Sequence, residues 1–136
     1  MKVIPWIGYY GRMKSAKQAL EGAGYTVDMR GNMHCGMGAL TQNNYDIMIV
    51  QDSVEAGTFE LPEGVRPDDP IGRVQAFLGV VRRLERYSES PIIIPHTISA
   101  IDRARELEID ANIHLVSMLY ADSTTCLVET VGKYLS

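Results

Sequence analysis

The sequence predicts an α/β domain in which five parallel strands alternate with five helices. Residues 47–50 and 92–94 are apolar at every position, which is typical of strands in the middle of a parallel sheet covered on both faces. Between the predicted strands, apolar residues recur every three or four positions, as they do on a helix that packs one face against a core. Strict alternation of this kind predicts a three-layer (βα)5 sandwich, and right-handed crossovers limit its topology to a few choices.

Length and composition fit one domain. The chain has 136 residues, 46% of them hydrophobic, and neither an internal repeat nor a linker divides it, so we expect a single domain over residues 1–136. The net charge of −4 argues against a nucleic-acid partner, because no basic run is present to neutralise phosphates. No apolar run approaches the roughly 20 residues that span a bilayer, so no membrane partner is expected either.

The cysteines and the N-terminus indicate a compartment. Cys35 and Cys126 do not suggest a disulfide framework in a domain of this size, and both are expected to be reduced. The apolar stretch after Lys2 is broken by Pro5 and followed by Gly8, so no signal peptide is visible. These observations predict a cytoplasmic protein.

The first half of the chain contains three predicted strands. Residues 3–7 form the first, although Pro5 weakens this prediction because proline donates no ladder hydrogen bond. A helix follows from Met13 and is stopped by Gly22 and Gly24. The remaining elements are a strand over residues 25–29, a glycine-rich loop over residues 31–38, a short helix over residues 39–43 and the buried strand over residues 47–50.

The second half contains three predicted helices and two strands. A long helix begins with Asp69 as its N-cap and Pro70 in its first turn. Ser99, with Asp102 three residues later, resembles a capping box for the next helix. Asp122 or Ser123 is expected to cap the last helix. The expected core-facing positions are Ile71, Val74, Phe77, Leu78, Val81 and Leu84 in the first of these helices, Ile101, Ala104 and Leu107 in the second, and Leu127, Val131 and Leu135 in the third. The strands between them cover residues 92–94 and 113–118.

The acidic segment, residues 54–69, is too long for the tight layout of the other connections. It is rich in acidic residues, glycine and proline, and a loop of this length inside a compact domain is usually functional or mobile. We expect its contacts to lie outside the core, so that it either covers the strand ends or presents side chains to a partner. The candidate partner-facing residues are Glu55, Phe59, Glu60 and Leu61.

Three stretches resemble receiver domains, the phospho-acceptor modules of two-component signalling. They are YDIMIV at residues 45–50, VVRRLERYSESPIIIPHT at residues 80–97 and ARELEIDANIHLVSM at residues 104–118. The resemblance covers most of the chain and implies the flavodoxin-like fold with strand order 2-1-3-4-5. It also implies a role in signalling or regulation through a protein partner, and it leaves a homodimer open.

The side chains that receivers use for phosphotransfer are missing. A receiver has an acidic pair after its first strand and an aspartate at the end of its third; together they hold Mg²⁺, and the second accepts the phosphoryl group. Here the first strand is followed by Gly8 without any acid, and the acceptor position falls on Gln51, whose amide cannot form an acyl phosphate. The hydroxyl position falls on His96, next to Thr97, and the lysine position on Ser117. The resemblance therefore implies a degenerate receiver without a metal, cofactor or catalytic residue.

A second resemblance, to flavodoxins, leaves a small-molecule function open. MKVIPWIGYYG at residues 1–11 has the rhythm of their first strand and phosphate loop, and DSVEAGTFELPEG at residues 52–64 is similar to the loop after their third strand. That phosphate loop needs hydroxyl side chains around its glycines. The corresponding positions hold Tyr9, Tyr10, Arg12 and Met13. This alternative predicts a nucleotide, flavin or phosphorylated metabolite at the strand ends, or an enzyme that uses them.

A small-molecule site would lie at the carboxyl ends of the strands, where ligands bind in open parallel sheets, although a polar rim at that edge is also an ordinary feature of this fold. Backbone N–H groups over residues 8–11, with Arg12, could hold a small anion there. Asp52 could replace Gln51 as the acceptor only if the strand bulged by one residue. The expected rim consists of Gly8, Tyr9, Gly11, Arg12, Gln51, Asp52, Ser53, His96, Thr97 and Ser117.

Two weaker constellations complete the candidates. His34 and Cys35 offer soft ligands that suit copper, but two adjacent residues chelate poorly without further partners, so no metal site is predicted. Asp52, Ser53 and His96 would suggest nucleophilic catalysis only if the fold joined them in a suitable geometry.

Overall fold

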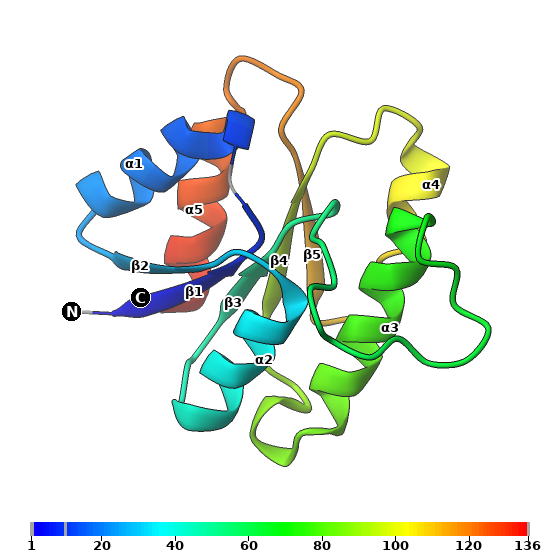
Figure 1. Cartoon of the computed structure of the whole chain (residues 1–136). Coiled ribbons are helices and arrows are strands. Elements are labelled where there is room, and N and C mark those ends of the chain that lie inside the picture. The colour runs from blue at the N-terminus through cyan, green and yellow to red at the C-terminus, as the bar shows by residue number, and fades with distance from the viewer. Residues whose placement is uncertain (1, 10, 136) are drawn as a thin grey trace.

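The computed structural model describes residues 2–9 and 11–135, without the side chain of Arg12, and contains one parallel five-stranded sheet in the order β2-β1-β3-β4-β5 (Figure 1). Its strands are β1 (Val3–Ile7), β2 (Thr26–Arg30), β3 (Met48–Val50), β4 (Ile92–His96) and β5 (Ile113–Ser117). Its helices are α1 (Lys14–Gly22), α2 (Met33–Gln42), α3 (Pro70–Arg83), α4 (Ile101–Arg105) and α5 (Ser123–Leu135), with short 3₁₀ turns at Gly11–Met13 and Glu85–Tyr87. The predicted fold class and strand order are confirmed.

The sheet separates two hydrophobic cores. One core lies against α2 and α3, and the other lies against α1 and α5 (Figure 1). Successive residues of β3 alternate between them, because side chains on a strand point to opposite faces. Val50 belongs to the first core and Ile49 to the second, and both are fully buried. Among the described residues, no helix is long and apolar enough to cross a membrane.

Two prolines lie inside strands without disturbing the ladders. Pairing between β1 and β3 covers only Trp6 and Ile7, so Pro5 precedes it. Pairing between β3 and β4 ends at Ile93, and Pro95 lies beyond that point. Each proline is therefore placed where the ladder with β3 does not require an N–H donor.

Helix α2 corrects the predicted glycine-rich loop. The side chain of Asn32 is its N-cap and accepts a hydrogen bond from the backbone N–H of Cys35 at 2.8 Å, so the helix begins directly after this asparagine. A Cβ atom on Gly36 would lie only 2.6 Å from the side chain of Ile7. The glycine is therefore needed where α2 packs closely on β1, and not because the backbone turns there.

Helices α3 and α5 follow the prediction closely. Asp69 is the N-cap residue of α3, although its side chain makes no capping hydrogen bond. Helix α5 begins at Ser123, whose hydroxyl accepts the backbone N–H of Tyr120 instead of one in the helix. The buried apolar residues of the two helices are Ile71, Val74, Phe77, Leu78 and Val81, and Leu127 and Val131.

Helix α4 is shorter than the sequence suggested. Its N-cap is Ala100 and not Ser99, and no side chain caps it. Asp102 carries one methylene fewer than the glutamate of a capping box, so it is a poor replacement for that residue. Ile101, expected in the core, is 55% exposed, whereas Leu107 is buried. Helix α4 has only five residues, so it is too short to present a continuous apolar face to the sheet.

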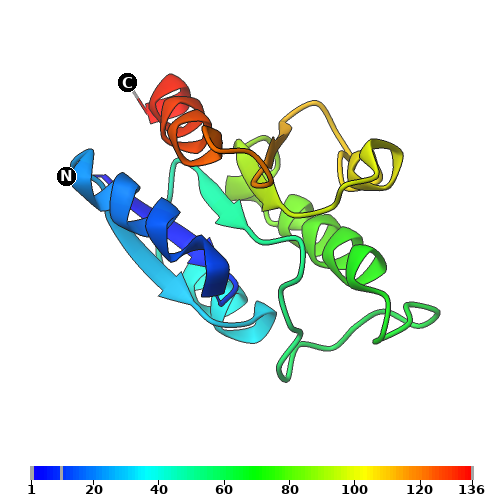
Figure 2. The same ribbon diagram turned by 90° about the horizontal axis from the view of Figure 1, so that it is seen from above.

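The acidic segment is attached to the core, which corrects the expectation that its contacts lie outside. Val54 is buried, and the Phe59 ring packs edge-on against Phe77 of α3 with the ring centroids 5.4 Å apart. The Glu55 carbonyl accepts the backbone N–H of Met33 at 2.8 Å, beside the start of α2. The segment then continues out beside α3 (Figure 2). These contacts hold its first half in place and leave the second half as a projecting turn.

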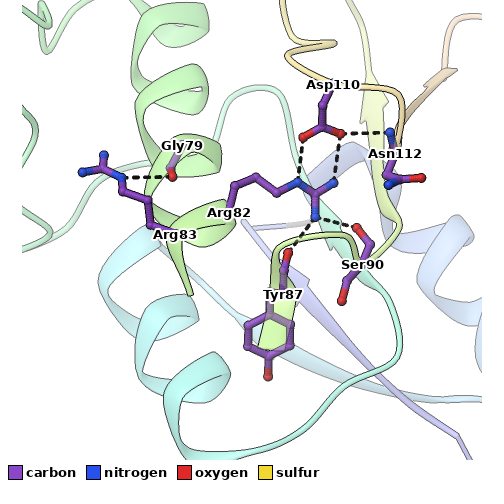
Figure 3. Close-up of polar contacts among 7 residues, drawn as sticks. All are labelled: Gly79, Arg82, Arg83, Tyr87, Ser90, Asp110 and Asn112. Atoms are coloured by element: carbon purple, nitrogen blue, oxygen red, sulfur yellow. Dashed lines mark hydrogen bonds and ion pairs between the residues drawn. The ribbon is translucent and has the colours of Figure 1, made fainter. Parts of the chain in front are cut away.

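Arg82 connects the end of α3 to the turns that precede β4 and β5 (Figure 3). Its guanidinium donates two hydrogen bonds to Asp110, at 2.8 and 3.2 Å, and one each to the carbonyls of Tyr87 and Ser90, at 2.8 and 2.6 Å. Asp110 also accepts the backbone N–H of Asn112 at 2.9 Å. A planar five-donor group suits this arrangement, because it can bind a carboxylate and two carbonyls at once.

Candidate functional site

Several predicted rim residues meet at the carboxyl ends of the strands. Gly8 lies against Gln51, and Asp52 accepts a hydrogen bond from Thr97. His96 and Ser117 are register partners in β4 and β5. The exposed rim residues are Tyr9, Gly11, Ser53 and Thr97. Tyr10 and the side chain of Arg12, both invoked for anion binding, lie outside the described part of the chain.

The Gln51 side chain points into the protein. Its side chain is 4% exposed, and its Oε1 accepts the indole N–H of Trp6 at 2.8 Å. Its Nε2 donates to the Met13 sulfur at 3.6 Å. A buried indole N–H needs an acceptor, and the glutamine supplies one. Gln51 therefore has a structural role beneath the site.

Gly8 allows this arrangement. Its φ of +139° is a conformation that favours glycine, and an added Cβ would lie 2.7 Å from the Gln51 Oε1. The turn after β1 thus passes directly over the Gln51 amide. No side chain at this position could reach a bound ion, because the amide fills the space.

Asp52 and His96 are the buried polar groups of the site. Asp52 is 6% exposed; its Oδ2 accepts the Thr97 N–H at 3.3 Å, and its Oδ1 is buried without a hydrogen-bond partner. His96 is 2% exposed, and its Nδ1 also has no partner. Burial raises the pKa of Asp52, and the Thr97 N–H and the nearby His96 oppose this shift. Among the described residues no hydrogen bond joins Ser53 to Asp52 or His96, and the His96 Nδ1 has no partner, so the three residues do not form a nucleophile, base and orienting acid.

We expect Asp52→Asn to remove a pH dependence of stability. A carboxyl group with a raised pKa in the folded state binds protons more tightly there than in the unfolded state. The free energy of unfolding should therefore fall as pH rises from the ordinary aspartate value of about 4 through the raised folded value. The free energy of unfolding of the variant should exceed that of wild type near neutral pH, and this difference should disappear in acid. Chemical denaturation followed at several pH values measures the difference; parallel pH profiles for the two proteins would contradict it.

A cleft of about 590 Å³ lies next to these residues, between the turns that follow β1, β4 and β5. Two of the residues that line this cleft were candidates from the sequence: Thr97 as a rim residue, and Met13 as a position in the flavodoxin-like phosphate loop. Two signals could have found more of it: the exposed Leu119 and Tyr120, and the hydroxyl residues at the start of α5. The lining residues are Met13, Ser15, Thr97, Met118, Leu119, Tyr120, Ala121, Ser123 and Thr124.

The described residues contain no group suited to a metal ion. No three histidine, cysteine, aspartate or glutamate side chains gather anywhere in residues 2–9 and 11–135. His34 and Cys35 are both exposed in the first turn of α2 and have no third ligand nearby. The turn after β1, which carries the acidic pair in receivers, has Gly8 and Tyr9 instead.

Comparison with solved structures agrees with this topology. The chain is similar to the chemotaxis response regulator CheY4 of Vibrio cholerae, with a TM-score of 0.71, 14% identity, and coverage of 98% of this chain and 97% of that one. It is also similar to a CheY-like response regulator receiver domain protein from Methanospirillum hungatei, with a TM-score of 0.66, 13% identity, and coverage of 99% and 94%. For a Thermotoga maritima response regulator solved with Mg²⁺ and BeF, the TM-score is 0.62, the identity 18%, and the coverage 98% and 99%.

The chain has the receiver fold. No protein-family model matches it, and no curated protein does so. At identities below 20%, the structural likeness concerns the fold, and function must be argued from the site.

Proposed function

We propose that this receiver-like domain does not accept a phosphoryl group and acts as a protein–protein interaction module in signalling or regulation. The observation that carries this proposal is that Gln51, at the position aligned with the phospho-acceptor, is buried, and that its side-chain oxygen accepts the indole N–H of Trp6. An amide is a poor nucleophile and gives no acyl phosphate. The missing acidic residues after β1 remove the Mg²⁺ ligands that would neutralise a phosphoryl group.

Asp52 is a poor substitute for the missing acceptor. It follows Gln51 directly, and its carboxylate is buried and bonded to the backbone N–H of Thr97. The other carboxylate oxygen of Asp52, Oδ1, has no hydrogen-bond partner and is also buried. Burial raises the pKa of Asp52, because the enclosed site disfavours the charged carboxylate.

We predict no Mg²⁺-dependent phosphorylation by acetyl phosphate. The intact mass should not change, and beryllofluoride should leave the fluorescence of Trp6, the only tryptophan, unaltered. A receiver with a complete acidic set, treated in parallel, is the positive control. Gln51→Asp should also stay unmodified, because it restores an acceptor without its metal ligands. A phosphoryl adduct on Asp52 in the wild-type protein would disprove the proposal.

The strand-end cleft supports a second candidate, small-molecule binding. Its walls combine thioether, aromatic and hydroxyl side chains, as many ligand pockets do. A thermal-shift screen with nucleotides, flavins and phosphorylated metabolites tests it. Ligand-dependent stabilisation that Thr97→Val or Ser123→Ala weakens would favour this candidate over the interaction module.

We also propose that the domain is cytoplasmic. Cys35 and Cys126 are both free and exposed, which suits a reducing compartment. A fluorescent fusion localised in cells tests this assignment.

A further inference from the structure

We propose that the projecting turn of the acidic segment and the adjoining face of α3 form a docking groove for an extended basic peptide of a partner protein. This inference rests on the proposed interaction function and names its surface. It begins from a groove of about 500 Å³ between the turn and the helix. The residues that line it are Pro62, Gly64, Val65, Arg66, Asp69, Gly72, Gln75 and Ala76.

The walls of this groove suit an extended chain. Gly72 and Ala76 are small residues on α3, and Pro62, Gly64 and Val65 form the opposite, mostly apolar side. Small side chains let a peptide backbone approach closely, and apolar walls give partly exposed area that a partner can cover.

The charge of the chain is concentrated beside the groove. The acidic segment carries five acidic residues and Arg66, which gives it a net charge of −4, equal to that of the entire chain. The remainder has twelve acidic and twelve basic side chains and is therefore neutral. A basic partner is thus attracted to one region of an otherwise balanced surface, which favours a specific orientation on encounter.

Some of these acids are free to meet a partner. Among the described residues, Glu60 and Glu63 are exposed and have no ion-pair partner, whereas Asp68 pairs with Arg66 at 2.9 Å. Glu55 lies 3.9 Å from the buried guanidinium of Arg73 and is itself 80% exposed. Unpaired carboxylates beside a groove with both apolar and polar walls complement a peptide that alternates basic and apolar residues.

The groove is held in shape before a partner binds. Arg73, a buried residue of α3, donates to the carbonyl of Pro67, and Phe59 packs against Phe77 at the start of the segment. Pro62 and Pro67 further limit the conformations of the turn. Preformed geometry lowers the conformational entropy lost on docking, so a short peptide can bind without ordering the loop. Phe59 and Leu61 are partly buried against the core and serve as supports, which leaves Glu55 and Glu60 as the contacts among the expected partner-facing residues.

The test uses fluorescence anisotropy with a short labelled peptide that alternates arginine and leucine. The peptide with glutamate in place of arginine should not bind. Glu60→Lys with Glu63→Lys should weaken binding by about tenfold, because attraction becomes repulsion. The matched control is Glu89→Lys with Glu129→Lys, which makes the same charge change at exposed sites elsewhere and should have a much smaller effect.

Ala76→Gln tests the groove itself, because it adds a neutral side chain to the wall without altering charge. It should weaken binding about fivefold, or roughly 1 kcal/mol. Gly79→Gln, on the same helix outside the groove and with open space around its Cβ, should not weaken it. Circular dichroism must confirm that all variants fold. Three results would each overturn the docking groove. They are no binding of the peptide by the wild type, equal losses of affinity in the two charge-reversal pairs, and full affinity in Ala76→Gln. None of these results would bear on phosphoryl uptake, which tests the proposed function separately.

Discussion

Val50→Asp should leave the domain unfolded. Val50 is fully buried in β3, at the centre of the sheet, among the apolar residues that face α2 and α3. A carboxylate there has no cation or hydrogen-bond donor to pair with and must be buried charged or protonated. We expect a cost of about 4 kcal/mol or more, comparable with the total stability of many small domains. Far-UV circular dichroism and the emission maximum of Trp6 measure the loss.

The matched control is Val3→Asp, at the start of β1, where the valine is 43% exposed. Its carboxylate stays in water, so the free energy of unfolding should fall by less than about 1 kcal/mol. Native-like stability in Val50→Asp would mean that this strand is not at the centre of the sheet.

Arg82→Ala should lower the free energy of unfolding by about 3 kcal/mol. The substitution removes four hydrogen bonds and leaves the Tyr87 and Ser90 carbonyls without this donor (Figure 3). Arg82→Lys keeps the charge but cannot bind a carboxylate and two carbonyls together, so it should recover only part of the loss. Urea denaturation measures each variant.

Arg83→Ala is the control for that variant. Arg83 is the next residue along α3 and is exposed; within the described part of the chain it donates only to the carbonyl of Gly79 in its own helix, at 3.3 Å. Its replacement should cost less than about 0.5 kcal/mol. Equal losses at the two positions would show that the Arg82 contacts contribute little.

Acid should reduce the difference between wild type and Arg82→Ala. The hydrogen bond from Arg82 holds the pKa of Asp110 below its usual range. The stabilisation from this ionised carboxyl is therefore present above the unfolded value of about 4 and is lost as pH falls through the lower folded value. Denaturation curves recorded from neutral pH into this acid range should converge in part, since the two carbonyl contacts do not titrate.

Hydrophobic patterning was sufficient to predict the sheet. Short, wholly apolar strands can be stable only between two layers, and apolar residues at helical spacing supply those layers. This is why β3 and the inner face of α3 were placed correctly. The position of Gln51 relative to the receivers' acceptor aspartate came instead from the resemblance, aligned on Tyr45 and Asp46.

Packing between distant segments decided what local sequence did not. The glycines of α2 suggested a loop, but Gly36 is small because β1 lies against it. The acidic segment was expected to make its contacts outside the core, yet Phe59 packs against Phe77 of α3. In both cases the deciding contact joins residues far apart in the chain, which periodicity within a short window cannot detect.

The sequence by itself determined the α/β alternation, the strand order through its resemblance to receivers, and the absence of acidic residues directly after β1. Only the tertiary structure decided the roles of the polar residues at the strand ends. Gln51 is bonded to Trp6, and Asp52 is buried beside Thr97, so both side chains are enclosed by the protein. The physical reason is that the type of a side chain sets which hydrogen bonds it is able to make. The fold decides which of them it makes, because it determines whether the side chain is buried and which groups lie within hydrogen-bonding distance, about 3 Å.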